Sequence, residues 1–312
     1  MNDAGSGGPH PSRRRFLKGA AGLAALSATV GAAPFARAAA QARRTPQQRP
    51  RVLFLTHPGV GTGHASLPAA ERMAIEYGTT GGFDVTVHEG YLTLGNHDFG
   101  FLTMEYLNSF DALMLMTNGD LPWSDEQRQG IVEFVRGGKG FIGVHCASLT
   151  MYEYPEFGEM LGGYYVRFIT PARDLARGRV HSLKVEDGTH PSTRMLGDSW
   201  PISEELYNYA WVPWNEEDPT HNVSDPGGFR PPIGFNRERV NVLLSLDTER
   251  TNLQGLYRVH KGGDYPQAWY REYGEGRSFY TSLGHREETW TQNDVFRAHL
   301  TGGIRWALGL ED

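Results

Sequence analysis

Three histidines, His64, His145 and His285, each come a few residues after a short apolar run of the sequence. An imidazole has an unperturbed pKa near 6.5, so a histidine can take up or release a proton close to neutral pH. We predict that His145 acts as a general acid or base and that His64 and His285 assist it. This chemistry requires that the fold bring the three rings together.

The apolar runs have the length and composition of buried strands, and amphipathic segments lie between several of them. We predict strands at 51–56, 83–88, 110–116, 139–144, 178–185, 240–246, 268–273 and 277–283. Helices are predicted to begin at Ser66, Ser124 and Asp294, the first ending at Gly78 and the second near Arg136. This order predicts an α/β three-layer sandwich with an open, mostly parallel sheet. In such sheets ligands bind beyond the carboxyl ends of the strands, where the three histidines would meet.

Carboxylates beside aromatic rings form a second pattern, in the segment Glu204-Glu-Leu-Tyr207. Carboxylates accept hydrogen bonds from sugar hydroxyls, and aromatic planes pack on the apolar face of a sugar ring. We therefore assign Glu205 to the catalytic group and expect a small-molecule carbohydrate as the ligand. The residues predicted to bind it are Asp120, His190, Tyr207, Trp269 and Arg277.

The first forty residues are predicted to be a targeting signal rather than part of the fold. The segment 12–18 matches the twin-arginine export motif, an apolar run follows over 19–33, and Ala36-Arg-Ala38 is typical of a cleavage site. We predict a signal peptide over 1–38, a flexible linker over 39–50 and one domain over 51–312. The predicted location is the periplasm or the cell exterior, with no membrane span left after cleavage.

The composition excludes several classes of protein. One cysteine among 312 residues rules out an internal disulfide framework and cysteine-cluster metal sites. Cleavage after Ala38 would remove five Lys or Arg residues and one Asp, which leaves 274 residues with a formal charge of −10. That charge argues against a nucleic-acid partner. The sequence leaves the oligomeric state open, a homo-oligomer included.

Several motifs resemble the trehalose-utilisation (ThuA-like) family over about residues 51–310. They are Gly63-His64, Gly137 to His145, His190-Pro191, Glu204 to Tyr207, Pro266-Gln-Ala-Trp269, Gly274 to Tyr280, Gly284-His285 and Gly303 to Ala307. The resemblance implies a flavodoxin-like sandwich related to class I glutamine amidotransferases. It also implies a role in sugar catabolism, on oxidised (keto) disaccharides or glycosides. Glu204 departs from the family, which usually has Asp at that position.

Three alternatives stay open at the level of sequence. Cys146, His285 and Glu287 could form an amidotransferase-like nucleophilic triad, although His145 rather than Cys146 occupies the position where the strand ends. A divalent metal could be bound by His57, His64, His145 and His285. The protein could also be a non-catalytic periplasmic sugar-binding or accessory protein, since a fold does not determine a function.

Overall fold

The computed structural model describes residues 48–59, 63–90, 97–211 and 233–312. The predicted signal peptide, most of the predicted linker and the Pro- and Gly-rich segment around Trp214 lie outside the described residues. The end of the predicted linker is part of the fold. Arg49 donates hydrogen bonds to the carbonyls of Gly78 and Phe83 and pairs with Asp84 at 3.2 Å.

Among the described residues, nine strands form one sheet, in the order β2-β1-β3-β4-β11-β10-β9-β6-β7. The first part is parallel and consists of β2 (Asp84–His88), β1 (Arg51–Leu55), β3 (Ala112–Leu115), β4 (Gly140–Val144) and β11 (Gly276–Thr281). The side chains of β3 and β4 are buried throughout, as expected of strands covered on both faces.

The rest of the sheet is antiparallel. It consists of β10 (Pro266–Tyr273), β9 (Asn241–Leu246), β6 (His181–Val185) and β7 (Ser199–Ile202). Two short strands, β5 (Tyr165–Phe168) and β8 (Tyr207–Tyr209), pair separately. The predicted hairpin is β10–β11, whose strands meet at Gly274, with a φ of 60°.

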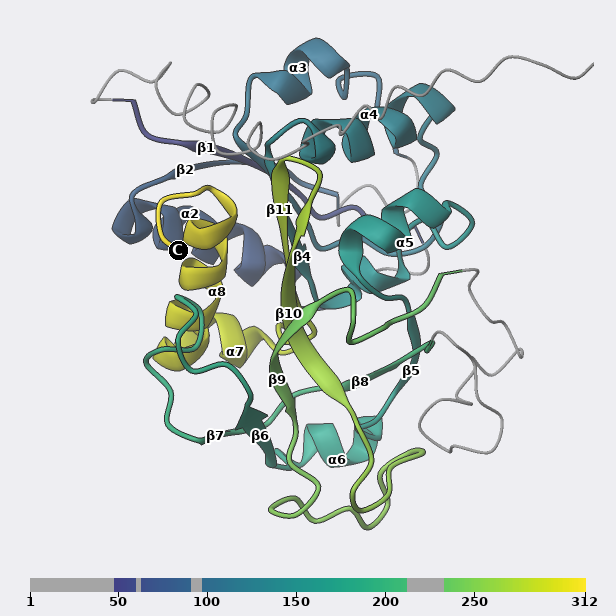
Figure 1. The fold of residues 1–312 in the computed structure, drawn as a ribbon, viewed down its shortest axis with the longest axis vertical. Coiled ribbons are helices and arrows are strands. Elements are labelled where there is room, and N and C mark those ends of the chain that lie inside the picture. The colour runs from purple at the N-terminus through teal and green to yellow at the C-terminus, as the bar shows by residue number, and fades with distance from the viewer. Residues whose placement is uncertain (1–47, 60–62, 91–96, 212–232) are drawn as a thin grey trace, which may run out of the picture.

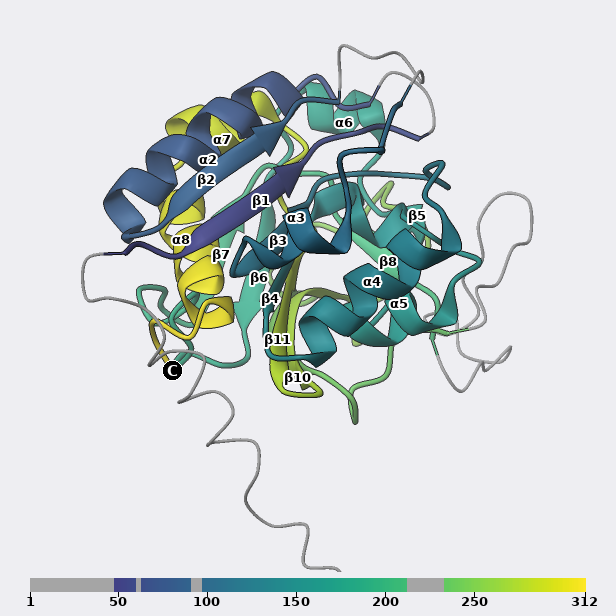
Figure 2. The same cartoon turned by 90° about the horizontal axis from the view of Figure 1, so that it is seen from above.

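Helices cover both faces of the sheet, so the predicted three-layer α/β class is confirmed (Figures 1 and 2). One side carries α2 (Leu67–Gly81), α7 (Glu287–Gln292) and α8 (Asp294–Ala307). The other carries α3 (Met104–Asn108), α4 (Asp125–Arg136) and α5 (Pro155–Leu161), while α6 (Ala172–Ala176) lies near the antiparallel part. None of the helices in the described part of the chain has the length and apolarity that a membrane span needs.

The predicted helix ends needed three corrections. Helix α2 continues past Gly78 to Gly81, and Gly82, with a φ of 81°, terminates it. Ser66 precedes α2, but its hydroxyl donates to the carbonyl of Gly284 instead of capping the helix. The cap of α8 is Asn293, whose side chain accepts from the Phe296 amide, and not Asp294.

Candidate functional site

His145 lies directly after β4, at the carboxyl edge of the parallel strands, and starts the 3-10 helix η2 (His145–Leu149). Its φ of 48° is in the left-handed region, which is uncommon for a residue other than glycine and is typical of a sharp turn that aims a side chain. The ring is fully buried. Its Nδ1 is 2.6 Å from the carbonyl oxygen of Ser282, so Nδ1 must carry the proton. In the neutral ring, Nε2 is therefore the atom that carries the lone pair.

Three side chains surround Nε2 of His145. The Tyr207 hydroxyl is 2.7 Å away, Nδ1 of His285 is 3.2 Å away and Oε2 of Glu205 is 3.5 Å away. Glu205 Oε2 also lies 3.2 Å from Nδ1 of His285. The Tyr207 ring stacks on His145, with 4.6 Å between the ring centroids. The site thus combines two imidazoles, a carboxylate and a phenol within hydrogen-bonding range.

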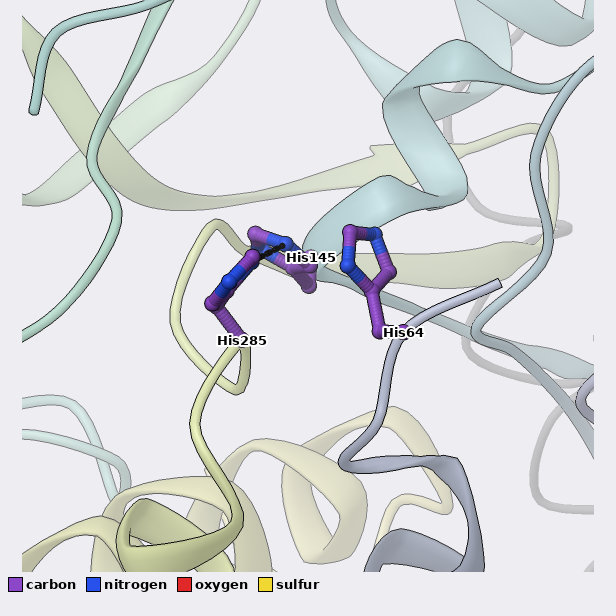
Figure 3. Close-up of side chains that lie close together, drawn as sticks. All are labelled: His64, His145 and His285. Carbon is purple, nitrogen blue, oxygen red and sulfur yellow. Dashed lines mark hydrogen bonds between the residues drawn. The ribbon is translucent and has the colours of Figure 1, made fainter. Parts of the chain in front are cut away.

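His64 completes the cluster from the loop between β1 and α2. Its ring centroid is 4.5 Å from that of His145 and 4.9 Å from that of His285. Figure 3 shows the three rings converging from three separate segments of the chain. Gly63, with a φ of 73°, sets the path of this loop, and the carbonyl of His64 accepts from the Leu67 amide at 3.1 Å. The prediction that the three histidines meet is confirmed by these distances.

The loop that carries His285 is held by a buried carboxylate, Glu204. One of its oxygens accepts from the amides of Gly284 and Arg286, at 3.3 and 3.2 Å. The other accepts from the amides of His285 and Glu205, at 3.2 and 2.9 Å. Glu204 thus faces the loop, whereas the adjacent carboxylate of Glu205 faces the histidines. Glu204 therefore positions His285.

Gln267 on β10 connects the two groups that hold His145. Its side-chain oxygen accepts from the Tyr207 amide and from the Ser282 hydroxyl, at 3.0 and 2.7 Å. Its amide nitrogen donates to the carbonyl of Tyr207 at 2.8 Å, and its own carbonyl accepts from the Ser282 amide. Gln267 is fully buried, so these bonds are made away from water. It therefore fixes the stacking ring and the carbonyl acceptor of His145 relative to each other.

The surroundings separate the pKa values of the three histidines. Burial lowers the pKa of His64 to about 4, helped by the charge of His285 and opposed by that of Glu205. Burial also lowers the pKa of His145 well below its usual value, together with the charges of His64 and His285. For His285, burial disfavours the charged form, but the hydrogen bond to Glu205 and its charge outweigh burial and raise the pKa. His285 is thus the imidazole that keeps a proton most readily.

Solvent exposure decides which of these groups can touch a substrate. His145 is fully buried and Tyr207 is 2% exposed. The side chain of Glu205 is 13% exposed and that of His285 is 28% exposed, and His64 is half-buried. His145 and Tyr207 therefore form the floor of the site, whereas Glu205, His285 and His64 form its accessible surface.

The predicted stacking of aromatic side chains on a sugar ring is contradicted for Trp269. This side chain is fully buried, donates its Nε1–H to the carbonyl of Leu161 and packs against Tyr209 and Tyr280. It belongs to the apolar core on the side of α5. Tyr207 does lie in the site, but its ring stacks on His145, so that face is not free for a ligand.

Arg277 lies at the other end of the parallel strands, and His190 packs between the sheet and α8. Arg277 is the register partner of Gly140, the first residue of β4, and its guanidinium bonds the carbonyls of Trp306 and Glu311. His190 packs 5.3 Å from the Trp306 ring, and burial lowers its pKa to about 4. Both predicted contacts to the ligand are therefore wrong for this site.

Asp120 and His57 occupy the same edge as the cluster without joining it. Asp120 follows β3, is exposed and lies close enough to Tyr164 for its charge to act on that phenol. His57 is buried against the rings of His97 and Phe99, at 5.2 and 4.7 Å. Among the described residues, the group that could hold a metal consists of His64, His145 and His285. The prediction that His57 is a fourth ligand is therefore wrong.

The geometry also disagrees with the cysteine triad. Cys146 is 2% exposed within the apolar core, and burial raises the pKa of its thiol far above neutrality. Glu287 is exposed at the start of α7, and His285 pairs with Glu205 instead. His145, and not Cys146, occupies the position directly after β4 where an amidotransferase-like triad would need its nucleophile.

Sequence reasoning missed two residues that shape the site, Glu204 and Gln267. Glu204 is part of the Glu204 to Tyr207 motif, but the sequence assigns a role only to its neighbour Glu205. Gln267 stands in an apolar strand segment, where a buried amide side chain is uncommon unless it has partners. That context was the signal that could have identified it.

The fold and the site define an α/β sandwich protein with a histidine–glutamate cluster at the carboxyl edge of its parallel strands. The family model ThuA, described as trehalose utilisation, matches residues 51–224 and 232–307. The chain therefore belongs to the ThuA family, as its motifs predicted. The comparison with curated proteins finds no match.

Two solved structures share the fold. A ThuA-like protein from Bacteroides uniformis is 19% identical with a TM-score of 0.60, and covers 85% of this chain and 93% of its own. A ThuA-like protein from Parabacteroides merdae is also 19% identical, with a TM-score of 0.56 and coverage of 85% and 91%. At this identity the likeness supports the architecture, while the chemistry must be argued from the site.

Proposed function

We propose that this protein is an exported enzyme of sugar catabolism that acts on keto-disaccharides or keto-glycosides by proton transfer. The observation that carries the proposal is the contact between Glu205 and His285, 3.2 Å apart and both accessible. It places a carboxylate next to the imidazole whose pKa is raised. With a base and an acid side by side, the base can remove a proton from the carbon next to a ketone while the acid protonates the ketone oxygen.

In the proposed reaction, Glu205 takes the proton from the carbon beside the keto group. The electrons of that C–H bond move toward the carbonyl, and His285 donates a proton to the carbonyl oxygen, which yields an enediol. His145 and Tyr207 are buried below this pair and fix its orientation. We therefore assign the proton transfer to the accessible Glu205 and His285, and not to His145 as predicted from the sequence.

The enediol has two outcomes that the site can support. Isomerisation occurs when Glu205 returns its proton to the former carbonyl carbon and the neighbouring hydroxyl gives its proton to His285. Alternatively, the enediol oxygen returns its proton to His285 and re-forms the C=O bond, the electrons of the C=C bond expel the glycosidic oxygen from the next carbon, and the departing oxygen takes the proton from Glu205. That elimination converts a keto-glycoside into an unsaturated ketone and a free sugar or alcohol, with no oxidant or reductant consumed.

A substrate screen with matched variants tests the proposal. Glycosides and disaccharides are compared with their 3-keto derivatives, using the wild type, Glu205→Gln and Glu287→Gln. We expect turnover of at least one keto derivative, a loss of about 100-fold or more in Glu205→Gln, and near wild-type rates in Glu287→Gln. Glu287 is a matched control because it is an exposed carboxylate two residues from His285. Equal rates in all three proteins would contradict the assignment.

A binding-only accessory protein is the alternative from another class. Such a protein would bind a sugar without changing it, and Glu205→Gln would weaken binding without any turnover to lose. Calorimetry with the unmodified and the keto sugars, run alongside the turnover assay, separates the two functions. The contact between Glu205 and His285, two accessible groups that can carry protons, above the buried ring of His145 favours the enzyme.

Export through the twin-arginine route belongs to the same proposal. It is supported by the arginine motif at 12–18, the apolar run after it and the small residues at Ala36 and Ala38. Fractionation of cells that express the full chain, compared with a variant carrying Lys at Arg13 and Arg14, tests it. Equal amounts in the periplasm for both proteins would contradict the proposal.

A further inference from the structure

The three imidazoles of the cluster lie in an arrangement that suits a metal ion. Their ligand atoms, one from each of His64, His145 and His285, all lie within 4.8 Å of one another. Two ligands of a tetrahedral zinc ion, each about 2.0–2.1 Å from it, are roughly 3.3 Å apart. The 3.2 Å between Nε2 of His145 and Nδ1 of His285 matches that separation.

The hydrogen bond on the far side of His145 is a second, independent observation. A histidine that binds a metal through one nitrogen almost always donates its other N–H to a carbonyl or carboxylate. His145 does so through Nδ1, at 2.6 Å from the Ser282 carbonyl, and its Nε2 is thereby left as the lone-pair atom that faces the cluster. Gln267 in turn fixes Ser282, so the orientation of this ring is built into the fold.

The surroundings of the cluster favour a cation. Glu205 Oε2 lies 3.5 Å from Nε2 of His145 and 3.2 Å from Nδ1 of His285, close enough to offset positive charge. His64 and His285 are partly exposed, which gives an ion a path from solvent. Three imidazoles suit Zn²⁺ and other late first-row ions, whereas Mg²⁺ and Ca²⁺ prefer oxygen ligands.

We propose that His64, His145 and His285 form a binding site for one divalent first-row transition metal ion, of the Zn²⁺ or Co²⁺ type. The ion is bound on the histidine side, where it would take the place of the His285 proton in stabilising the carbonyl oxygen, and Glu205 stays beside it as the proton acceptor. The proposal deepens the proposed function and rests on it for its catalytic meaning, since a cation there would hold the carbonyl oxygen of a keto sugar and stabilise the enediolate. Binding of the ion itself does not depend on that function.

Metal binding to the purified, untagged full chain tests the proposal. The protein is freed of metal with a chelator, and Zn²⁺, Co²⁺ or Mg²⁺ is added in equilibrium dialysis followed by elemental analysis. We expect one Zn²⁺ or Co²⁺ per chain, a visible Co²⁺ absorption of a low-coordinate site, and Mg²⁺ binding at least about 100-fold weaker. The absence of a stoichiometric ion would overturn the proposal.

Variants show whether the ion uses these three rings. His64→Ala and His285→Ala each remove a partly exposed ligand, and each is expected to weaken Zn²⁺ binding by about 100-fold or more. His97→Ala is the control, because it removes an imidazole from the separate His57–His97 pair and should bind Zn²⁺ like the wild type. Circular dichroism checks that the variants are folded. Unchanged Zn²⁺ binding in both ligand variants would overturn the proposal.

The metal and the function fail in different ways. Turnover of a keto-glycoside by protein without bound metal, at the rate of metal-loaded protein, would overturn the role of the ion and leave the proposed function standing. Stoichiometric Zn²⁺ binding that is lost in His64→Ala and His285→Ala, with no keto sugar turned over, would overturn the proposed function and leave the metal site standing.

Discussion

Replacing Glu204 with Gln tests the claim that this carboxylate positions His285. The two oxygens of Glu204 accept four backbone N–H groups, from Glu205, Gly284, His285 and Arg286. A glutamine has one acceptor oxygen and an NH₂ group that cannot accept, so two of the four donors lose their partner. An unpartnered buried donor costs about 1–3 kcal/mol, and these groups are partly buried, so we expect a loss of about 2–4 kcal/mol.

A loss of that size lowers the Tm of a domain this long by about 4–8 °C. Thermal unfolding followed by circular dichroism measures it, and kcat/KM for the best keto sugar measures the effect on His285. The matched control is Glu205→Gln, the adjacent residue, whose side chain is 13% exposed. It should change Tm by about 2 °C or less while it abolishes turnover. A Glu204→Gln protein as stable as the wild type would refute the positioning role.

Four further outcomes follow from the structure. Tyr207→Phe removes the hydroxyl 2.7 Å from His145 Nε2 and should reduce kcat by about 10-fold with little change in KM; an unchanged kcat would contradict the contact. Trp269→Phe should lower stability by about 1–3 kcal/mol in urea unfolding and leave KM unchanged, because this ring lies in the core; a raised KM would restore a role in binding. Cys146→Ala should retain turnover, since a buried thiol of raised pKa is no nucleophile, and loss of activity in a folded variant would reinstate the triad. Burial raises the pKa of Glu71 to about 7 from 4.5, so the folded state binds this proton more tightly than the unfolded chain does. The stability that the difference contributes is fully present below pH 4.5 and is lost as the pH rises through 7. Glu71→Gln should therefore gain about 3 kcal/mol on the wild type between pH 4.5 and 8 in urea unfolding, and a constant difference would contradict the shift.

The sequence predicted the layers of the fold because buried strands and amphipathic helices have different periodicities. It also predicted that His64, His145 and His285 would meet, since each follows a strand and parallel strands end at one edge. The same rule argues against Arg277, which comes at the start of its strand and lies at the opposite end. That prediction relied on residue type and overlooked position.

Other parts of the site depend on details that local pattern does not carry. Which of Glu204 and Glu205 faces the histidines depends on the path of the chain between β7 and β8. Trp269 and Gln267 lie on one strand, and only the register with β11 shows that the glutamine supports the site while the tryptophan enters the core. The hydrogen bond between His145 and Ser282 joins residues 137 positions apart, so it follows from the assembled sheet.

The central claim is that Glu205 takes a proton from the carbon beside a keto group. The most direct measurement is the exchange of that C–H proton for deuterium in D₂O, followed by NMR on a 3-keto-glycoside. The account predicts that the wild type exchanges it at least about 100-fold faster than Glu205→Gln, with Glu287→Gln matching the wild type. Exchange that proceeds equally in Glu205→Gln, or product formed with no exchange and no loss of that proton, would contradict it.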